Sequence, residues 1–88
     1  MKITEIKIYP FDLGSSRSSL RAYADVALDG LVVIKGFRIM ASKSGDLFIG
    51  MPSKMGKGGK YYDQVEFKTD KFRSLLRSRI LDTYKEFY

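Results

Sequence analysis

A regular alternation of hydrophobic and polar residues is clearest between residues 20 and 28. Five hydrophobic positions alternate there with four others: Leu20, Ala22, Ala24, Val26 and Leu28 against Arg21, Tyr23, Asp25 and Ala27. Successive side chains of a strand point to opposite faces, so this period of two predicts a strand with one buried face. Lys2 to Tyr9 repeats the pattern, with Thr4, Ile6 and Ile8 on one face, and Pro10 ends it because proline cannot donate to a strand ladder.

Turn residues divide the next part of the chain. Asp29-Gly30 separates the strand over 20–28 from an apolar stretch over 31–40. Both turn residues tolerate positive φ, which favours a tight hairpin. The segments 11–19 and 42–46 are rich in Gly, Ser and Asp and are predicted to be turns or loops.

The third quarter of the chain predicts two more strands. Leu47 to Met51 is a short apolar run, and Tyr61 to Phe67 resumes a strand pattern. We expect residues 52–60 to form the loop that joins these two segments as antiparallel neighbours. The charged residues Lys60, Glu66 and Lys68 then favour an edge position for the second strand, because charge discourages further pairing.

The C-terminal residues change to a helical period. Thr69 or Asp70 is a suitable N-cap, because its side-chain oxygen can accept a free backbone N–H, and the helix is predicted to run to about Phe87. One face of this helix is apolar and consists of Phe72, Leu75, Leu76, Ile80, Tyr84 and Phe87. Arg73 and Arg77 fall together at one border of this face, Arg79 falls near its other side, and Lys71 points to solvent.

These elements predict a single α+β domain over residues 1–88: an antiparallel sheet of about five strands followed by one long C-terminal helix. A domain of 88 residues is often marginally stable alone. The chain has no Cys for disulfides and no His for the common zinc sites. Association with a second copy is the remaining support, so we expect a homodimer.

Positive charge is concentrated in the second part of the chain. Residues 1–34 are neutral overall, whereas residues 35–88 carry the whole net charge of +6. A localised positive field favours phosphate backbones or other anionic surfaces. The alternative is that the charge serves solubility, since small domains commonly carry a net charge of this size.

The residue types present argue against enzyme chemistry. There is no His for proton transfer and no Cys for nucleophilic attack. The carboxylates are scattered without the spacing of a catalytic pair or a metal cage. We therefore expect no catalysis, no cofactor, no metal and no small-molecule substrate.

The start of the chain does not read as a signal peptide, and no stretch reaches the roughly 20 apolar residues of a membrane span. We therefore expect a cytoplasmic protein without a membrane partner.

The stretch GMPSKMGKGGKYYD, residues 50–63, contains the most suggestive local chemistry. It fails as a Walker phosphate loop, because Gly58 follows Gly56-Lys57 where Ser or Thr is needed, and a strand follows where a helix is needed. The remaining signal is a flexible basic segment with Lys54, Lys57 and Lys60, which suits a phosphate backbone. A plain hairpin with solvated lysines explains the same residues equally well.

The helix arginines also have two interpretations. Arg73, Arg77 and Arg79 can lie along the edge of the core or pair with Asp70 or Asp82. Alternatively, Arg73 and Arg77, one turn apart, can reach phosphates or base edges of nucleic acid from one side of the helix.

Among the aromatic residues, Phe37, Phe48, Phe67 and Phe72 fit core positions. Adjacent Tyr61 and Tyr62 must face opposite sides of a strand, so at most one is core, and the other either packs on the surface or stacks on a base.

The order of segments resembles the SpoVG family (stage V sporulation protein G) over nearly the whole chain. The resemblance rests on ITEIKIYPF at 3–11, LRAYADVALDGLVVIKGFRI at 20–39, GDLFIGMPSK at 45–54, YYD at 61–63 and ILDTYKEF at 80–87. The most specific part is the apolar strand that runs into Met-Pro-Ser and a basic residue, Leu47 to Lys54. Met55 stands where many family members have a second basic residue. Asp63 is followed by Gln64-Val65-Glu66-Phe67 in place of the Asp-Ile-x-His/Phe-Pro element that many members have.

The resemblance implies a small dimeric bacterial protein with an α+β fold that binds DNA, and in some members RNA, and regulates gene expression, sporulation or septation. It implies nucleic-acid contacts by Lys54 and by Arg73, Arg77 and Arg79. From their charge we add Lys57, Lys60 and Lys71 to this candidate set. Two alternatives remain open, namely a protein-interaction module that binds an acidic protein partner, and a regulator that prefers RNA.

Overall fold

The computed structural model describes residues 1–10 and 19–87. Residues 11–18 of the loop predicted over 11–19 lie outside the described residues. Along the described chain the elements are β1 (Ile3–Pro10), β2 (Leu20–Leu28), β3 (Val32–Ala41), β4 (Leu47–Gly50), β5 (Ser53–Met55), the 3-10 turn η1 (Lys57–Gly59), β6 (Tyr61–Asp63) and α1 (Asp70–Phe87).

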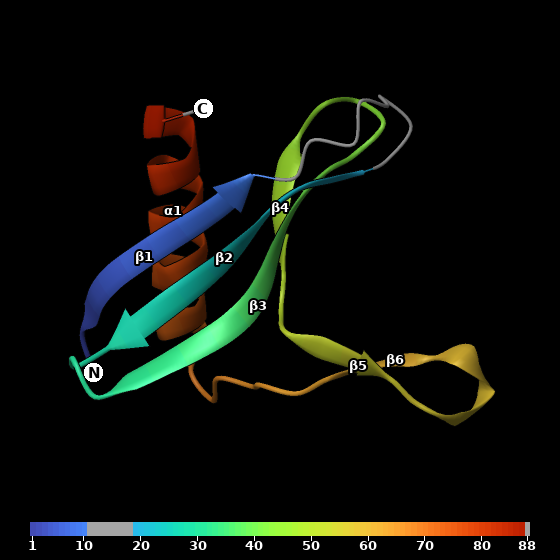
Figure 1. Ribbon diagram of the computed structural model, residues 1–88, viewed down its shortest axis with the longest axis horizontal. Helices are drawn as coiled ribbons and strands as arrows, with labels where there is room; N and C mark the ends of the chain where they lie inside the picture. Colours follow the sequence, from blue (N-terminus) through green and yellow to red (C-terminus); the bar gives the residue numbers. More distant parts are fainter. Residues whose placement is uncertain (11–18, 88) are drawn as a thin grey trace.

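Four strands form the main sheet in the order β1-β2-β3-β4, and every neighbouring pair is antiparallel. The helix α1 lies across one face of this sheet, and the β5–β6 hairpin extends away from both (Figure 1). The predicted α+β class is therefore confirmed, with sheet followed by one long C-terminal helix.

The core lies between the helix and the inner face of the sheet. The side chains of Phe37, Ile39, Leu76, Ile80 and Val26 are the largest that are fully buried. Alternate residues of β2 supply the small side chains Ala22 and Ala24 beside them, so bulky residues from β3 and α1 fit against the middle of the sheet.

β-Bulges change which residues face this core. In β1 the register shifts between Ile3 and Glu5, so Ile3 packs against the core and Thr4 is exposed, contrary to the predicted face. In β2 the register shifts between Leu20 and Ala22, so Leu20 pairs with Met40 on the outer face of the sheet. A bulge adds one residue to one strand, and this breaks the period of two on which the prediction rests.

The predicted tight turn after β2 is present. Asp29 and Gly30 have φ of 54° and 66°, and the Leu31 N–H donates to the Leu28 carbonyl at 3.0 Å. The Asp29 carboxylate also accepts a hydrogen bond of 2.7 Å from the backbone N–H of Lys2, which ties the turn to the start of β1.

The second turn and the start of the helix also agree with the sequence. The N–H of Ser42 donates to the Asp46 carbonyl at 2.8 Å across the turn between β3 and β4. The N–H of Phe72 donates to the Thr69 side-chain oxygen at 3.4 Å, so Thr69 acts as the N-cap of α1.

The predicted strand over 61–67 is wrong in extent and in partner. Only Tyr61–Asp63 is a strand, and it pairs with Ser53–Met55, inside the segment predicted to be a loop. The buried Pro52 separates β4 from β5, and its carbonyl accepts a hydrogen bond of 2.6 Å from Gln64 N–H at the base of the hairpin. Because proline has no N–H to offer a sheet ladder, the chain leaves the main sheet here.

Three apolar residues that the sequence placed in the core are exposed. Phe48 lies on β4 and is 45% exposed, and on α1 Leu75 and Phe87 are 48% and 67% exposed. Phe48 pairs with Met40 on the outer face of the sheet, which the helix does not cover. On α1 Leu81, which the sequence did not place on the apolar face, packs against the core, whereas Leu75 does not. Phe67 and Phe72 do pack against the core, with ring centroids 5.1 Å apart.

Candidate functional site

The β5–β6 hairpin carries the three lysines that the sequence singled out. Lys54 lies on β5, Lys57 opens the turn η1, and Lys60 follows it, and all three are exposed. The turn is closed by the Gly56 N–H, which donates to the Lys60 carbonyl at 2.7 Å. Gly58 and Gly59 have φ of 80° and 79°, which L side chains rarely adopt, so this tight basic tip depends on its glycines.

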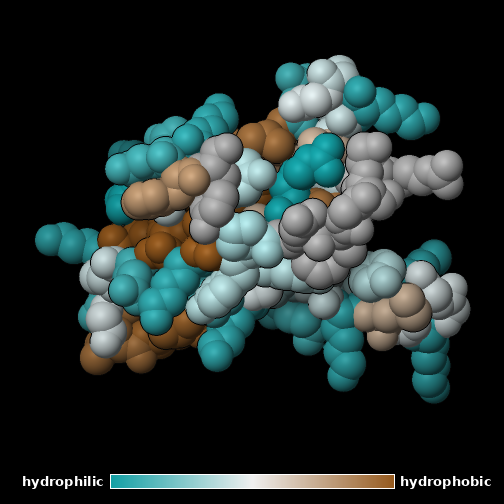
Figure 2. Space-filling view, turned by 45° about the horizontal axis from the view of Figure 1, so that its top comes forward, coloured by the Kyte–Doolittle hydropathy of each residue, from teal (hydrophilic) through white to brown (hydrophobic). Residues whose placement is uncertain are grey.

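These lysines have no acidic partner among the described residues. The ion pairs formed within residues 1–10 and 19–87 join Lys7 to Glu5, Lys68 to Glu66 and Arg73 to Asp70, and none involves the hairpin. In Figure 2 hydrophilic side chains project from the lower right, where the hairpin lies in Figure 1. The hairpin therefore presents positive charge that the described part of the protein does not neutralise.

The two faces of the hairpin differ in chemistry. Lys54 pairs directly with Tyr62 across the two strands, and Met55 pairs with Tyr61. Residues directly opposite each other in an antiparallel pair share a face, so the Tyr62 face carries a lysine and the Tyr61 face carries a methionine. The ring of Tyr62 lies against Gly56, where any side chain would collide with it. Both tyrosines are exposed, so neither is a core residue.

Arg73 is held by two partners near the start of α1. One guanidinium nitrogen donates to the Phe67 carbonyl at 2.7 Å, and another lies 3.2 Å from an Asp70 carboxylate oxygen. This agrees with the interpretation that Arg73 pairs locally. Arg73 thereby ties the segment after β6 to the helix.

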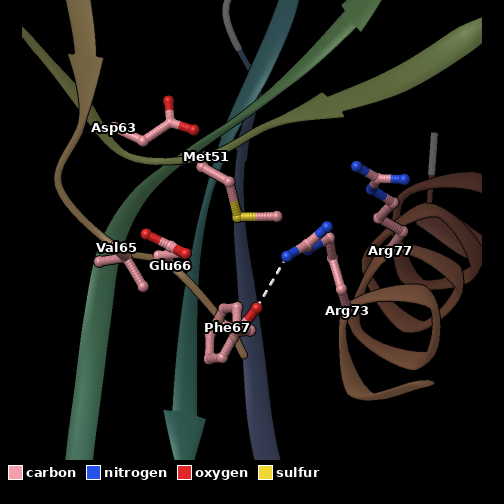
Figure 3. Close-up of a pocket in the computed structure, with 7 residues that line it drawn as sticks. All are labelled: Met51, Asp63, Val65, Glu66, Phe67, Arg73 and Arg77. Atoms are coloured by element: carbon pink, nitrogen blue, oxygen red, sulfur yellow. Dashed lines mark hydrogen bonds between the residues drawn. The ribbon is translucent and has the colours of Figure 1, made fainter. Parts of the chain in front are cut away.

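Arg77 lies one turn further along, where it lines the same hollow as Arg73 (Figure 3). It is exposed, and its guanidinium has no ion pair or hydrogen bond with the described residues. The sequence correctly placed these two arginines together. Lys71 and Arg79 are also exposed on the helix but do not line this hollow.

The hollow between the helix and the segment after β6 contains charges of both signs. It has a volume of about 250 Å³, and Asp63 and Glu66 line it together with Arg73 and Arg77. Figure 3 shows the two arginines entering from the helix and the two carboxylates from the chain opposite. A phosphate placed inside would be attracted by the arginines and repelled by the carboxylates. The hairpin lysines are thus the better anion contacts.

A second, larger hollow lies between the outer face of the main sheet and the hairpin. Its volume is about 470 Å³, and its lining includes Leu20, Tyr23, Arg38, Met40, Ser53 and Tyr61. We call it the sheet–hairpin hollow. The sequence did not single out Arg38 or Tyr23 as site residues. The available signal was that Arg38, like Lys35 and Gly36, interrupts the apolar character of this strand.

Neither a metal cage nor a membrane-spanning helix is found among residues 1–10 and 19–87. These residues contain no cluster of three or more acidic, His or Cys side chains that could hold a metal ion. Within the same ranges, no helix has the length and apolar character needed to cross a membrane.

Comparison with known proteins gives one consistent result. The family model described as SpoVG matches residues 1–86. A protein of Bdellovibrio bacteriovorus is 30% identical over 86 residues, covering 98% of this chain and 75% of the relative. A protein of Borreliella burgdorferi is 34% identical over 84 residues, covering 96% and 86%. One of Archaeoglobus fulgidus is 31% identical over 85 residues, covering 97% and 95%. All three relatives are named "Putative septation protein SpoVG".

Proposed function

The chain belongs to the SpoVG family, and from this premise we propose that it is a dimeric regulatory protein that binds DNA or RNA. The observation that carries the proposal is the β5–β6 hairpin with its three exposed lysines, Lys54, Lys57 and Lys60, which have no acidic partner in the described chain. Charged side chains of this kind bind phosphates and release the counterions condensed on nucleic acid.

The helix supplies the second part of the proposed interface. Arg77 is exposed without a described partner, and Lys71 and Arg79 add positive charge on the same helix. Arg73 acts mainly by holding the segment after β6 against α1, because its guanidinium already has two partners. The names of the relatives point to septation. We propose that binding to nucleic acid serves the regulation of gene expression in septation, sporulation or a related process.

The hairpin's role is tested by removing its three lysines together. In the variant K54A/K57A/K60A we expect weaker binding to duplex DNA of any sequence. The slope of log affinity against log salt should fall in magnitude by about 3, because each lost phosphate contact removes about 0.9. Fluorescence anisotropy over a series of salt concentrations measures both quantities.

The matched control removes the same charge elsewhere. Lys2, Lys43 and Lys85 are exposed and lie outside the hairpin, so K2A/K43A/K85A has the same net charge as the first variant. If the two variants lose equal affinity, the hairpin has no special role and only the overall charge matters. If the unaltered protein shows no salt-dependent binding of DNA or RNA, the proposed function is wrong.

An acidic protein partner is the alternative that the same lysines allow. A protein lacks the condensed counterions of nucleic acid, so such binding would show a shallower dependence on salt. In that case the unaltered chain would bind DNA and RNA only at the nonspecific level at physiological salt.

A further inference from the structure

The sheet–hairpin hollow has the size and mixed lining of a ligand site. Its volume of about 470 Å³ lies within the range of about 300–1,000 Å³ that small-molecule sites occupy. Two separate sheets build it, because Tyr23, Arg38 and Met40 come from the main sheet and Tyr61 comes from the hairpin. The hollow therefore exists only while the hairpin keeps its place beside the sheet.

An aromatic ring on the hairpin wall is available to a ligand. Tyr61 is 63% exposed, and its hydroxyl has no hydrogen-bond partner within residues 1–10 and 19–87. Tyr62 next to it lies on the opposite face of the hairpin, where its ring covers Gly56. The two neighbouring tyrosines thus have different surroundings, and only Tyr61 lines the hollow.

The sheet wall contains a cation, Arg38, whose charge is not paired by any carboxylate of the described residues. Arg38 is partly buried directly opposite Tyr23 on the neighbouring strand. One terminal nitrogen donates to the Met51 carbonyl at 3.3 Å, whereas its Nε is buried without a hydrogen-bond partner among the described residues. No carboxylate of residues 1–10 or 19–87 forms an ion pair with it. A cation removed from water is stabilised by an acceptor or an anion, so this wall favours a ligand rich in acceptors.

Resting on the proposed function, we propose that the sheet–hairpin hollow receives one unstacked base of a single-stranded nucleic acid. Bases of single strands stack on aromatic rings and on arginine planes, and their edges carry carbonyl and ring-nitrogen acceptors. Lys60, next to Tyr61, and Lys54 on the other face of the hairpin hold the flanking phosphates. A base paired within a duplex remains stacked on its neighbours and cannot enter such a hollow.

The test compares two neighbouring tyrosines on two kinds of nucleic acid. Fluorescence anisotropy is measured with a labelled mixed-sequence single strand, as RNA and as DNA, and with the matched duplex. We expect Y61A to weaken single-strand binding about 5- to 150-fold, which is the range for one base–aromatic stack, and to change duplex binding less than about twofold. We expect Y62A to change neither by more than about twofold, and Y61F to bind like the unaltered protein because it retains the ring.

A direct signal of stacking comes from a single strand that contains 2-aminopurine. Its fluorescence should change on binding to the unaltered protein and to Y62A, but not on binding to Y61A at saturating protein. The strand type that shows this dependence on Tyr61, RNA or DNA, is the ligand of the hollow.

The possible failures are distinct. If Y61A binds single strands as tightly as the unaltered protein, or loses single-strand and duplex affinity equally, the hollow is not a base site. In either case the lysine-dependent binding still supports the proposed function. If Y62A loses as much single-strand affinity as Y61A, hairpin integrity and not the hollow explains the loss, and the inference is wrong. Absence of salt-dependent binding to every probe refutes the proposed function itself.

Discussion

Arg73 and Arg77 lie one helical turn apart, yet their guanidinium groups have different surroundings. Arg73 donates to the Phe67 carbonyl and lies against Asp70, whereas Arg77 has no described partner. A side chain that already satisfies local acceptors is poorly placed to bind an external phosphate, because its present partners must be released first. Two residues that the sequence treats alike therefore have separate roles, one in holding the fold and one available for binding.

This difference predicts that the same arginine-to-glutamine substitution affects fold stability at position 73 and nucleic-acid binding at position 77. R73Q should lower the free energy of unfolding by about 1–2 kcal/mol, because it removes a charged hydrogen bond to a partly buried carbonyl. The ion pair adds little to this loss, since the Asp70 side chain is 94% exposed.

R77Q is the matched control, and its effect on stability should stay within about 0.5 kcal/mol. R77Q should instead weaken nucleic-acid binding. Urea denaturation at one fixed protein concentration measures the stability of both variants. Equal destabilisation by the two substitutions would contradict the assigned roles.

At the scale of elements, the helix contributes two fully buried side chains to the core, and Phe72, Leu81 and Tyr84 pack partly buried against it. Leu76 and Ile80 are fully buried against the inner face, whereas Leu75, next to Leu76 in the chain, is 48% exposed. Residues 76 and 80 are one turn apart and share a face. Leu76 and Ile80 are therefore the helix side chains whose truncation should cost the most stability.

We predict a large difference in stability between two leucine-to-alanine variants. L76A should lower the free energy of unfolding by about 2–5 kcal/mol, since it opens a cavity in the core. L75A removes a half-exposed side chain and should cost less than about 1 kcal/mol. Thermal or urea denaturation followed by circular dichroism measures the stability of both variants. Similar losses of stability would mean that Leu75 is buried in a contact that a single chain does not form.

Sequence patterns predicted where the strands and the helix lie better than they predicted which face of each is buried. The period of two located β1 and β2, the apolar stretch over 31–40 located β3, and turn chemistry located Asp29-Gly30, because all three signals are local. The bulges at Thr4 and next to Leu20 were not predictable, because the register between two paired strands cannot be read from the hydrophobic pattern of either strand alone. The partner of Tyr61–Asp63 was mistaken for the same reason, because pairing depends on where the chain turns after Pro52.

The candidate site was predictable only in part. The lysines of the hairpin stood out because charge and glycine content are visible in the sequence. The sheet–hairpin hollow was not visible, because Arg38 and Tyr61 are 23 positions apart and meet only once both sheets are in place. Arg38 carried one local signal, a charge within a largely apolar strand, but Lys35 carries the same signal, so the sequence could not single out Arg38.

At the scale of the whole molecule, three consecutive apolar residues are exposed together at one end. Leu31 is 86% exposed, and Val32 and Val33 are each 55% exposed, at the turn between β2 and β3. Figure 2 shows hydrophobic side chains toward the left, the side on which this turn lies in Figure 1. Contiguous apolar surface of this kind is typical of contact with another chain, which supports the proposed homodimer.

The dimer is tested by light scattering coupled to size-exclusion chromatography. We expect a mass near twice the 10.1 kDa of the single chain at micromolar concentration. Thermal stability should also rise with protein concentration, because association stabilises the folded state by mass action. A mass near that of a single chain, with stability independent of concentration, would contradict the dimer.

No residue from Ser53 to Asp63 is buried, although this segment carries the lysines and Tyr61. Folding therefore places few demands on the side chains of the hairpin beyond the glycines of its tip. Selection can change its charge or its aromatic residues over evolutionary time while the sheet and helix stay intact. In this family the hairpin is where we expect ligand preference to diverge between species, since new specificity there costs little stability.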